Sequence, residues 1–375
     1  MLSFWEKRSF VEYDHVVIGS GIVGLSTAIS IREKQPEASV LVLEKGLFPT
    51  GASTKNAGFA CFGSLTELLE DIQIMGEEKA LELVRLRVDG LNKLRNRLGE
   101  RSIDYRNYGG YELMGDEESD SLQQLDTVNH WLSPLFSLPV FQMRNDLIKS
   151  FGFHTAKVKT LVFNPYESQI DTGKMMKALI RLAQKKGIQI LTGSEVESLH
   201  DSGKVEVRVG ADMAPITILA GKVAVCTNAF TRSLLPDLEL APGRGIVLVT
   251  HPLDNLKFKG TFHIERGYYY FRNFGKRVIF GGGRNLFPEE ETSTRFEINE
   301  KILAELKLRL DEVILPGTPY EIEHTWAGIM AFGHDKQPIL RKYSENIFVG
   351  ARLGGMGVAI GSTLGERLAE MMVKD

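Results

Sequence analysis

A glycine-rich stretch between two apolar runs constrains this chain more than any other feature. The apolar run 16–18 is followed by Gly19, Gly21 and Gly24 at G-x-G-x-x-G spacing, and a helical segment then leads to the apolar run 40–43. Strand, glycine turn, helix and strand in this order are typical of a βαβ unit that binds a dinucleotide. We therefore expect an α/β protein with a doubly wound, Rossmann-type sheet.

Each glycine of this fingerprint has its own task. Gly19 makes the tight turn, Gly21 lets the backbone approach a pyrophosphate, and Gly24 lets the helix pack closely on the strand. The helix starts at Ile22 and Val23, where free NH groups and the helix dipole favour negative charge. The phosphates of a dinucleotide are therefore expected at this point.

An acidic residue ends the second strand of the unit. Glu44, followed by Lys45, lies 25 residues after Gly19, where an acceptor for the adenosine ribose is expected. A carboxylate at this position would repel a 2'-phosphate, which argues against NADP. The fingerprint by itself does not distinguish FAD from NAD.

The composition is ordinary for a soluble globular protein, with 43% hydrophobic and 25% charged residues. The 45 Lys and Arg against 48 Asp and Glu leave a net charge of -3 without blocks of like charge, so no nucleic-acid surface is indicated. Cys61 and Cys226 lie far apart and lack metal-ligand spacing, so we predict neither a disulfide nor a metal site. The first residues are charged and no apolar run approaches ~18 residues, so we expect a cytoplasmic protein without a transmembrane segment.

A run of small and polar residues follows the second strand, and Ser64 and Glu67 then form a capping box that opens a helix. The stretch 51–58 resembles the second cofactor loop of the D-amino-acid oxidase family of flavoproteins, which includes glycine oxidase, sarcosine oxidase and gamma-glutamylputrescine oxidase. The residues that match are Ser53, Lys55, Asn56, Ala57 and Gly58. The resemblance implies FAD, with this loop, including Thr54, beside the pyrophosphate and the flavin ring. Residues 4–6, Phe-Trp-Glu, are similar to the gamma-glutamylputrescine oxidase branch.

A second glycine loop lies hundreds of residues after the first. Residues 346–350 are typical of a strand, residues 351–357 of a glycine loop, and the following residues of a helix. In the family this loop places backbone NH groups at the flavin pyrimidine, where negative charge develops on reduction. The resemblance thus implies cofactor contacts at Gly354, Gly355, Met356, Gly357 and Val358. Since a NAD dehydrogenase has no need of this loop, FAD is favoured over NAD.

The resemblance extends over nearly the whole chain. Asp171 caps a long helix, Val196 is expected near the adenine, and the strand that ends in Cys226 leads to Thr227 and Asn228 beside the cofactor. Cys226 is interpreted as an inert, buried thiol. We expect a discontinuous FAD-binding domain and a second α+β substrate domain on a mixed or antiparallel sheet, and residues 100–160 show no recognisable chemistry. The expected segments are 1–76, 161–240 and 331–375 for the first domain and 77–160 and 241–330 for the second.

A tyrosine-rich hairpin is the most informative part of the expected substrate domain. Strand alternation places Tyr268, Tyr270 and Arg272 on one face, and the resemblance puts Tyr270 where amino-acid oxidases carry an active-site tyrosine. A tight turn would pair Arg272 with Arg277, which is unfavourable for like charges. Arg284 and Arg352 therefore stay open as alternative partners for a substrate carboxylate.

The segment 326–338 resembles the family segment that ends in Asp-x-x-Pro, but it departs from the pattern. Amino-acid oxidases place a carboxylate-binding arginine where this chain has Ile329 and Met330. Trp326 is expected to be either a pocket wall or part of the core. His324 and His334 are candidate acid/base residues, although an isolated histidine is more often structural.

The resemblance implies oxidation of a CH-NH bond in an amine or amino-acid-like substrate by hydride transfer to flavin, with O2 or another acceptor taking the electrons. One alternative is a flavin-dependent dehydrogenase of a 2-hydroxy acid that passes electrons to a quinone or carrier. A second alternative is an NAD-binding or non-catalytic nucleotide-binding protein.

Overall fold

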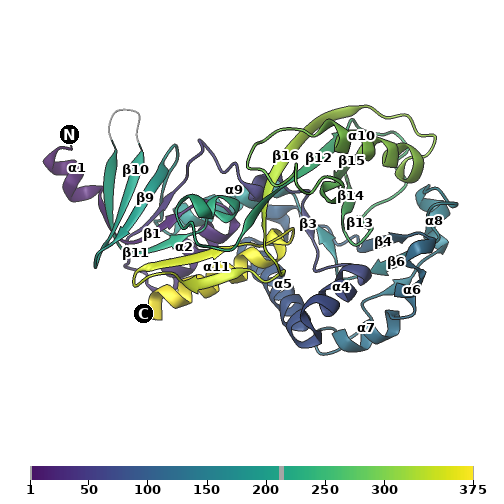
Figure 1. Cartoon of the computed structure of the whole chain (residues 1–375), viewed down its shortest axis with the longest axis horizontal. Coiled ribbons are helices and arrows are strands. Elements are labelled where there is room, and N and C mark those ends of the chain that lie inside the picture. Colours follow the sequence, from purple (N-terminus) through teal and green to yellow (C-terminus); the bar gives the residue numbers. More distant parts are fainter. Residues whose placement is uncertain (1, 211–214, 375) are drawn as a thin grey trace.

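The computed structural model describes residues 2–210 and 215–374. Two large sheets, here called sheet A and sheet C, organise the molecule, and the chain passes between them several times (Figure 1). Sheet A lies beside the N- and C-terminal helices, and sheet C forms the other lobe. The two expected parts, an α/β nucleotide-binding part and a largely antiparallel part, are both present.

Sheet A contains the predicted βαβ unit. Its strands β18, β11, β1, β2 and β8 are parallel, β17 pairs antiparallel with β18, and β10 and β9 extend β11 as antiparallel strands. The order along the sheet is β17 (Ile339–Lys342), β18 (Ile347–Ala351), β11 (Ile216–Val225), β1 (Glu12–Ile18), β2 (Val40–Leu43) and β8 (Gln189–Leu191). In addition, β10 (Val205–Gly210) pairs with β11, and β9 (Glu195–Asp201) pairs with β10.

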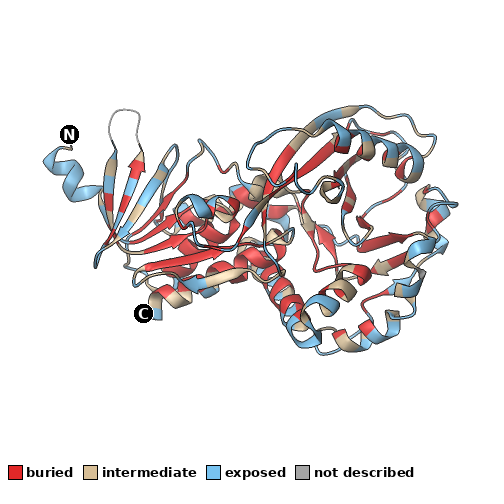
Figure 2. Ribbon diagram, in the orientation of Figure 1, coloured by how far each residue is buried: buried red, intermediate tan, exposed pale blue. Residues whose placement is uncertain are grey.

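Both faces are buried along β2, β18 and the last residues of β1, which explains why these stretches are continuously apolar. Val17 and Val42 face the helices α2 (Ile22–Lys34), α5 (Glu77–Leu98), α9 (Thr172–Lys185) and α11 (Gly357–Lys374). Val16 and Leu41 face β10 and the residues after the turn η3 (Asn228–Ser233), such as Leu238. The second face is thus covered mainly by strands and turns (Figure 2).

Small residues let α11 lie directly against α2. A Cβ atom on Gly361 would come within 2.5 Å of Ile22, and one on Gly365 within 2.6 Å of Ser26. Because of this close approach, the N-termini of α2 and α11 are held in a fixed relation, and both are implicated in cofactor binding by the sequence.

Sheet C is antiparallel except where β13 and β4 pair in parallel. One face carries an aromatic core that includes Tyr269, Phe271 and Phe280 and is covered by α8 (Asp146–Phe151) and α10 (Glu300–Arg309). The order is β16 (Ile322–Phe332), β12 (Ala241–Thr250), β15 (Arg277–Gly282), β14 (Tyr269–Phe274), β13 (Thr261–Ile264), β4 (Gly110–Met114), β6 (Thr160–Asn164) and β5 (Gln142–Met143).

Shorter elements connect the two sheets. The expected capping box of Ser64 and Glu67 opens α4, and Asp171 caps α9 by accepting a hydrogen bond from the Lys174 amide at 2.9 Å. The remaining elements are α1 (Phe4–Ser9), α3 (Ala52–Lys55), β3 (Phe59–Ala60), which pairs with β7 (Ser168–Gln169), α4 (Leu65–Met75), η1 (Glu100–Ile103), η2 (Asp116–Glu118), α6 (Ser119–Leu122), α7 (Leu125–Leu132), η4 (Arg284–Leu286) and the π-helical turn η5 (Leu310–Ile314).

Two details of the expected domain division differ from the structure. β6 belongs to sheet C, so a boundary at residue 161 cuts a strand. α5 packs on α11, where a Cβ atom on Gly90 would lie 1.9 Å from the Ala359 carbonyl oxygen. We therefore propose that residues 77–98 belong to the FAD-binding part and that this part resumes near β7.

No helix within the ranges 2–210 and 215–374 has the length and apolar character that are needed to cross a membrane.

Candidate active site

The glycine fingerprint forms the turn between β1 and α2 that the sequence predicts. Gly19 has a φ of 100°, and a Cβ atom there would lie 2.7 Å from the carbonyl oxygen of Cys226 on the neighbouring strand. A Cβ atom on Gly24 would lie 1.9 Å from the Gly19 oxygen, so only glycine fits. The amides of Val23 and Gly24 have no acceptor among the described residues and are free for an anion.

Glu44 lies at the carboxyl end of β2, beside this turn. Its carboxylate accepts hydrogen bonds from the Ser20 amide at 3.0 Å, the Ser20 hydroxyl at 2.6 Å and the Gly46 amide at 2.9 Å. Lys45 is exposed and forms an ion pair with Glu195, which brings β9 and the half-buried Val196 to the same edge. This edge has the composition of an adenosine site.

The second cofactor loop is attached to the start of α2. Ser53 Oγ accepts a hydrogen bond from the Ile22 amide at 3.0 Å, and the Thr54 hydroxyl donates a hydrogen bond to the Pro49 carbonyl. Asn56 Oδ1 accepts from the Gly58 amide at 2.8 Å and from Thr172 Oγ1 at 3.0 Å. The structure therefore brings the two cofactor motifs together, as the sequence predicts.

The C-terminal glycine loop meets the same region. Gly354 has a φ of 55°, and a Cβ atom on Gly355 or Gly357 would meet open space. The amides of Gly357 and Val358, at the start of α11, have no acceptor in the described part of the chain. Asn228, which follows Thr227 and has a φ of 47°, accepts a hydrogen bond from the Arg352 amide at 3.1 Å. Two helix starts with free amides, an acidic strand end and open glycine positions fit FAD.

Sheet C turns its other face toward the second cofactor loop. Pairing places one line of residues across this face: Glu112, His263, Tyr270, Gly281, Val247 and Trp326. The chain after α3 crosses the line. Trp326 Nε1 donates to the Lys55 carbonyl at 2.9 Å, Arg272 Nε donates to the Ala57 carbonyl, and the Phe59 ring lies edge-on to Tyr270.

Tyr270 lies across the neighbouring strands of sheet C. Its ring covers Gly281, and its hydroxyl lies 4.0 Å from the position that a Cβ atom of Gly245 would occupy. The methyl group of Met330 lies 2.9 Å from the same position. Burial raises the pKa of Tyr270 to about 12, so its hydroxyl stays protonated and can donate a hydrogen bond.

The three candidate arginines differ in what their guanidinium groups contact. Arg272 is buried and donates to the carbonyls of Ala57 and Ile170, and burial lowers its pKa to about 10. Arg352 donates to Asp335 at 2.7 Å and to the carbonyls of Gln337 and Glu239. Both groups are thus occupied by the protein itself.

Arg284 has no such partner. Its guanidinium lies over the Phe332 ring, 4.1 Å from the ring centre, and forms no hydrogen bond or ion pair with any residue that the structure describes. Its side chain lies 3.4 Å from the Cβ position of Gly243, two residues along β12 from Gly245. Burial lowers the pKa of Arg284 from its ordinary value.

The expected repulsion between Arg272 and Arg277 is wrong. Arg272 pairs with Ile279, and Arg277 pairs with Phe274, because the turn consists of Gly275 and Lys276. The shorter turn moves the register by two residues.

The histidines that the sequence singled out lie outside this region or at its edge. His324 is exposed and stacks on Trp326 with 5.9 Å between ring centres, and His334 is exposed and pairs with Glu239. Cys226 is buried at the end of β11, and burial raises its thiol pKa to about 12, which is the inert state expected.

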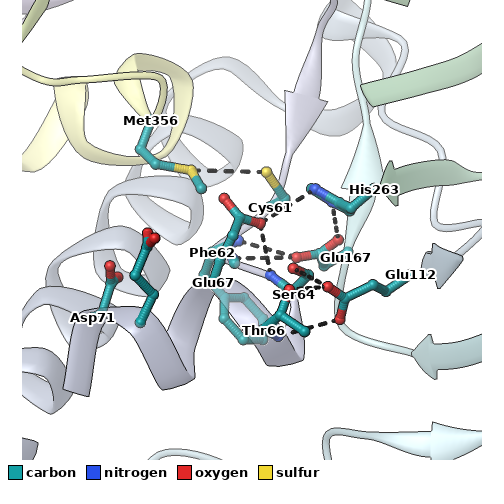
Figure 3. A network of polar contacts seen from close by, with 12 residues as sticks. Cys61, Phe62, Ser64, Thr66, Glu67, Asp71, Glu112, Glu167, His263 and Met356 are labelled. Carbon is teal, nitrogen blue, oxygen red and sulfur yellow. Dashed lines mark hydrogen bonds and ion pairs between the residues drawn. The ribbon is translucent and has the colours of Figure 1, made fainter. Parts of the chain in front are cut away.

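A buried polar cluster, which the sequence did not reveal, lies at the end of the same face (Figure 3). His263 lies between the carboxylates of Glu67 and Glu167, and Glu112 accepts hydrogen bonds from Ser64 and Thr66 at the start of α4. Residues 100–160, in which the sequence shows no recognisable chemistry, thus contribute Glu112 to this cluster. The available signal was a polar residue inside a short buried strand, in Tyr-Glu-Leu-Met and Thr-Phe-His-Ile.

Cys61 joins this cluster from the segment after β3. Its Sγ atom lies within 4.8 Å of a Glu167 oxygen and a His263 nitrogen, and 3.9 Å from the Met356 sulfur of the C-terminal glycine loop. Burial raises the pKa of the Cys61 thiol well above its ordinary value. The cluster is therefore continuous with the cofactor loops.

Comparisons with known proteins agree with this geometry. The curated protein "Probable oxidoreductase OrdL" of Haemophilus influenzae is 23% identical and aligns with 96% of this chain and 83% of its own length. The fold matches the crystal structure of L-proline dehydrogenase from P. horikoshii at a TM-score of 0.78, with 18% identity over 97% of this chain and 94% of that one. Glycine oxidase from Geobacillus kaustophilus matches at 0.74, with 18% identity over 97% and 95%.

A family model described as FAD dependent oxidoreductase matches residues 14–371, which include all three cofactor loops and both sheets. This chain therefore belongs to the family of FAD dependent oxidoreductases, and its cofactor is FAD.

Proposed function

We propose that this protein oxidises a CH-NH bond of an amine that also carries an anionic group. When bound, FAD would accept a hydride from the substrate carbon while the substrate nitrogen loses a proton, and O2 or another acceptor would take the electrons from it. Water would hydrolyse the imine product. FAD supplies the redox chemistry, while the chain supplies binding and orientation.

We further propose that FAD is held by the first turn of α2, the second cofactor loop and the start of α11. The free amides at both helix starts favour the pyrophosphate and the electron-rich side of the ring. Glu44 is proposed to accept hydrogen bonds from the ribose, with Val196 near the adenine. Trp326 and Arg272 are proposed to position the second cofactor loop, because their donors bind its carbonyls.

The observation that carries the proposal is the placement of one hydroxyl and one free guanidinium along a glycine strip of β12. Gly243 and Gly245 carry no side chains of their own, and Arg284 and Tyr270 lie beside the two ends of this strip. The Phe332 ring lies 2.4 Å from the Cβ position of Gly243, and the Met330 methyl group lies 2.9 Å from that of Gly245. Alternate residues of a strand are about 7 Å apart, which suits a small substrate once the flexible Met330 side chain moves aside.

Arg284 is proposed to bind the anionic end of the substrate. A half-buried guanidinium without a carboxylate partner among the described residues retains its capacity for charge-assisted hydrogen bonds. Phe332 stacks on it from one side and also lies 4.0 Å from the position that a Cβ atom on Gly354 of the C-terminal glycine loop would occupy. Arg284 thus replaces the arginine that is absent at Ile329 and Met330.

Tyr270 is proposed to orient the substrate by donating a hydrogen bond from its phenol. The phenol is a weak acid at this depth, so it is not a base, and we propose that the amine binds in its neutral form. With a neutral amine the proposal needs no catalytic carboxylate.

The test is the visible spectrum of the purified protein, followed by anaerobic mixing with amines, N-methyl amino acids, D-amino acids and 2-hydroxy acids. We expect flavin absorbance near about 450 nm that is bleached by amines with a carboxylate. Bleaching by 2-hydroxy acids alone would establish the dehydrogenase alternative. No bleaching by any anionic amine would contradict the proposal.

A further inference from the structure

The segment 59–67, here called the strap, connects the second cofactor loop to α4 and lies against sheet C. Three buried side chains from sheet C and its connections bind it, which are Glu112, Glu167 and His263 (Figure 3). At its middle, Cys61 contacts Met356 of the C-terminal glycine loop. The strap therefore lies between two of the elements that form the cofactor site.

His263 is the centre of this attachment. Its Nδ1 atom lies 3.3 Å from Glu67 of the strap, and its Nε2 atom lies 3.2 Å from Glu167. Both nitrogens face carboxylates, so both must carry a proton to donate. The cluster is satisfied when His263 is an imidazolium.

The two carboxylates beside His263 also accept hydrogen bonds from backbone amides of the strap. Glu167 accepts hydrogen bonds from the amides of Phe62 at 3.4 Å and Gly63 at 3.3 Å, and Glu67 accepts from the Ser64 amide at 3.0 Å. The Phe59 ring also lies edge-on to His263, with 5.4 Å between ring centres. One imidazole thus holds the strap near both of its ends.

We propose that His263 is a positioning residue for the cofactor, whose imidazolium fixes the strap and thereby sets the affinity for FAD. This inference rests on the FAD cofactor and is independent of the substrate. Loss of the positive charge leaves two or three buried carboxylates facing one another, which repel and release the strap.

The charged groups around His263 determine the direction of its pH dependence. They are Glu67 from α4, Glu112 from β4, Glu167 from the turn before β7 and the Cys61 thiol, with Arg87 of α5 beyond Cys61. Burial alone would lower the pKa of His263, but Glu167 and Glu67 raise it to about 9. The stabilisation is therefore complete at low pH and is lost as the pH rises through about 9.

The experiment measures the dissociation constant of FAD for the full-length protein between pH 7 and pH 10, by the recovery of free-flavin fluorescence. For the unmodified protein we expect a rise of about 10-fold between pH 8 and pH 10. His263→Gln should show a constant about 10-fold higher already at pH 7.5 and little further change with pH. His200→Gln, at an exposed position of β9, is the matched control.

A second variant, Glu67→Gln, tests the same proposal if His263→Gln fails to fold. Glu67→Gln keeps the capping box, because glutamine also serves at this position, but it removes one carboxylate from His263. We expect the rise in the dissociation constant to begin at lower pH in this variant. Unchanged constants and pH profiles in both variants would overturn the proposal.

Metal analysis of the same preparations provides a further check. Cys61, Glu167 and His263 offer three different ligand atoms, and a transition metal held by His263 would replace the imidazolium. One tightly bound metal ion per chain that disappears in His263→Gln would therefore also overturn the proposal. Absence of bound metal, together with the expected pH profiles, supports it.

Discussion

Arg284 stacks on Phe332 with its guanidinium carbon 4.1 Å from the ring centre, and its NH donors bind no residue that the structure describes. Arg272 and Arg352, by contrast, use their donors on backbone carbonyls and on Asp335. Three arginines that look equivalent in the sequence therefore have different contacts. The roles proposed for them lead to different expected outcomes when each residue is changed.

Replacing Arg284 with methionine should weaken the binding of anionic amines. A charge-assisted hydrogen bond is worth about 1.5–3 kcal/mol, so we expect kcat/KM to fall about 10-fold to 100-fold, mainly through KM. The FAD content should stay the same, because Arg284 does not contact the second cofactor loop. Steady-state kinetics with an anionic amine and its neutral ester measure the effect.

Arg101→Met is the control for this change, since Arg101 is exposed on η1. It should leave both substrates unaffected. Equal losses for the anionic amine and its ester in Arg284→Met would show that Arg284 does not bind the anionic group.

Replacing Arg272 with lysine should instead weaken FAD binding. Lysine cannot reach two carbonyls with a fork of donors, and a buried carbonyl without a donor costs about 1–3 kcal/mol. We expect an FAD dissociation constant higher by about 10-fold, with KM unchanged once FAD is saturating. A variant that binds FAD normally but has a raised KM would contradict the positioning role of Arg272.

Replacing Gly245 with alanine should narrow the strip without unfolding the protein. The added methyl group meets the mobile end of Met330 at 2.9 Å and approaches the Tyr270 hydroxyl at 4.0 Å. Because Met330 can move, we expect a melting temperature within a few degrees of the original and a KM several-fold higher for bulky amines. Gly115→Ala, which meets only the Lys157 carbonyl at 3.6 Å, is the control. Unchanged KM values for amines of every size would place the substrate elsewhere.

Glu112 should make the protein less stable as the pH rises from 5 to 7.5. Burial raises the pKa of Glu112 to about 7 in the folded state, so the folded protein binds a proton that the unfolded chain releases near its ordinary pKa. A shift of this size corresponds to about 3 kcal/mol of the free energy of unfolding. Chemical denaturation at both pH values should show that the free energy of unfolding decreases from pH 5 to pH 7.5. We expect this decrease to be smaller by about 2 kcal/mol in Glu112→Gln than in the unmodified protein.

Glu37→Gln, at an exposed position, should preserve the decrease seen in the unmodified protein. An equal decrease in Glu112→Gln would mean that other groups cause the loss of stability, and that Glu112 is already ionised at low pH.

Local motifs made the nucleotide-binding part predictable. The fingerprint at Gly19, the acid at Glu44 and the loop at Ser53 are each defined by a few neighbouring residues, and the structure assembles them as expected. The caps of α4 and α9 were predictable for the same reason.

The polar cluster was not predictable because its members come from separate strands and turns. Glu112 and His263 become neighbours only through the parallel pairing of β4 and β13. No short-range pattern encodes this pairing, which joins strands about 150 residues apart in the sequence. The same argument applies to Arg284. Only the folded structure shows that Arg272 and Arg352 bind other groups of the protein, whereas the Arg284 guanidinium binds none among the described residues.

The close contact between α2 and α11 has a consequence for biosynthesis. The glycine turn leaves the ribosome early, but Gly361 and Gly365 complete its surroundings more than 300 residues later. We therefore expect the first βαβ unit to stay incompletely packed until α11 emerges. Flavin loading should accordingly be a late event, and a chain arrested before residue 357 should not retain the cofactor.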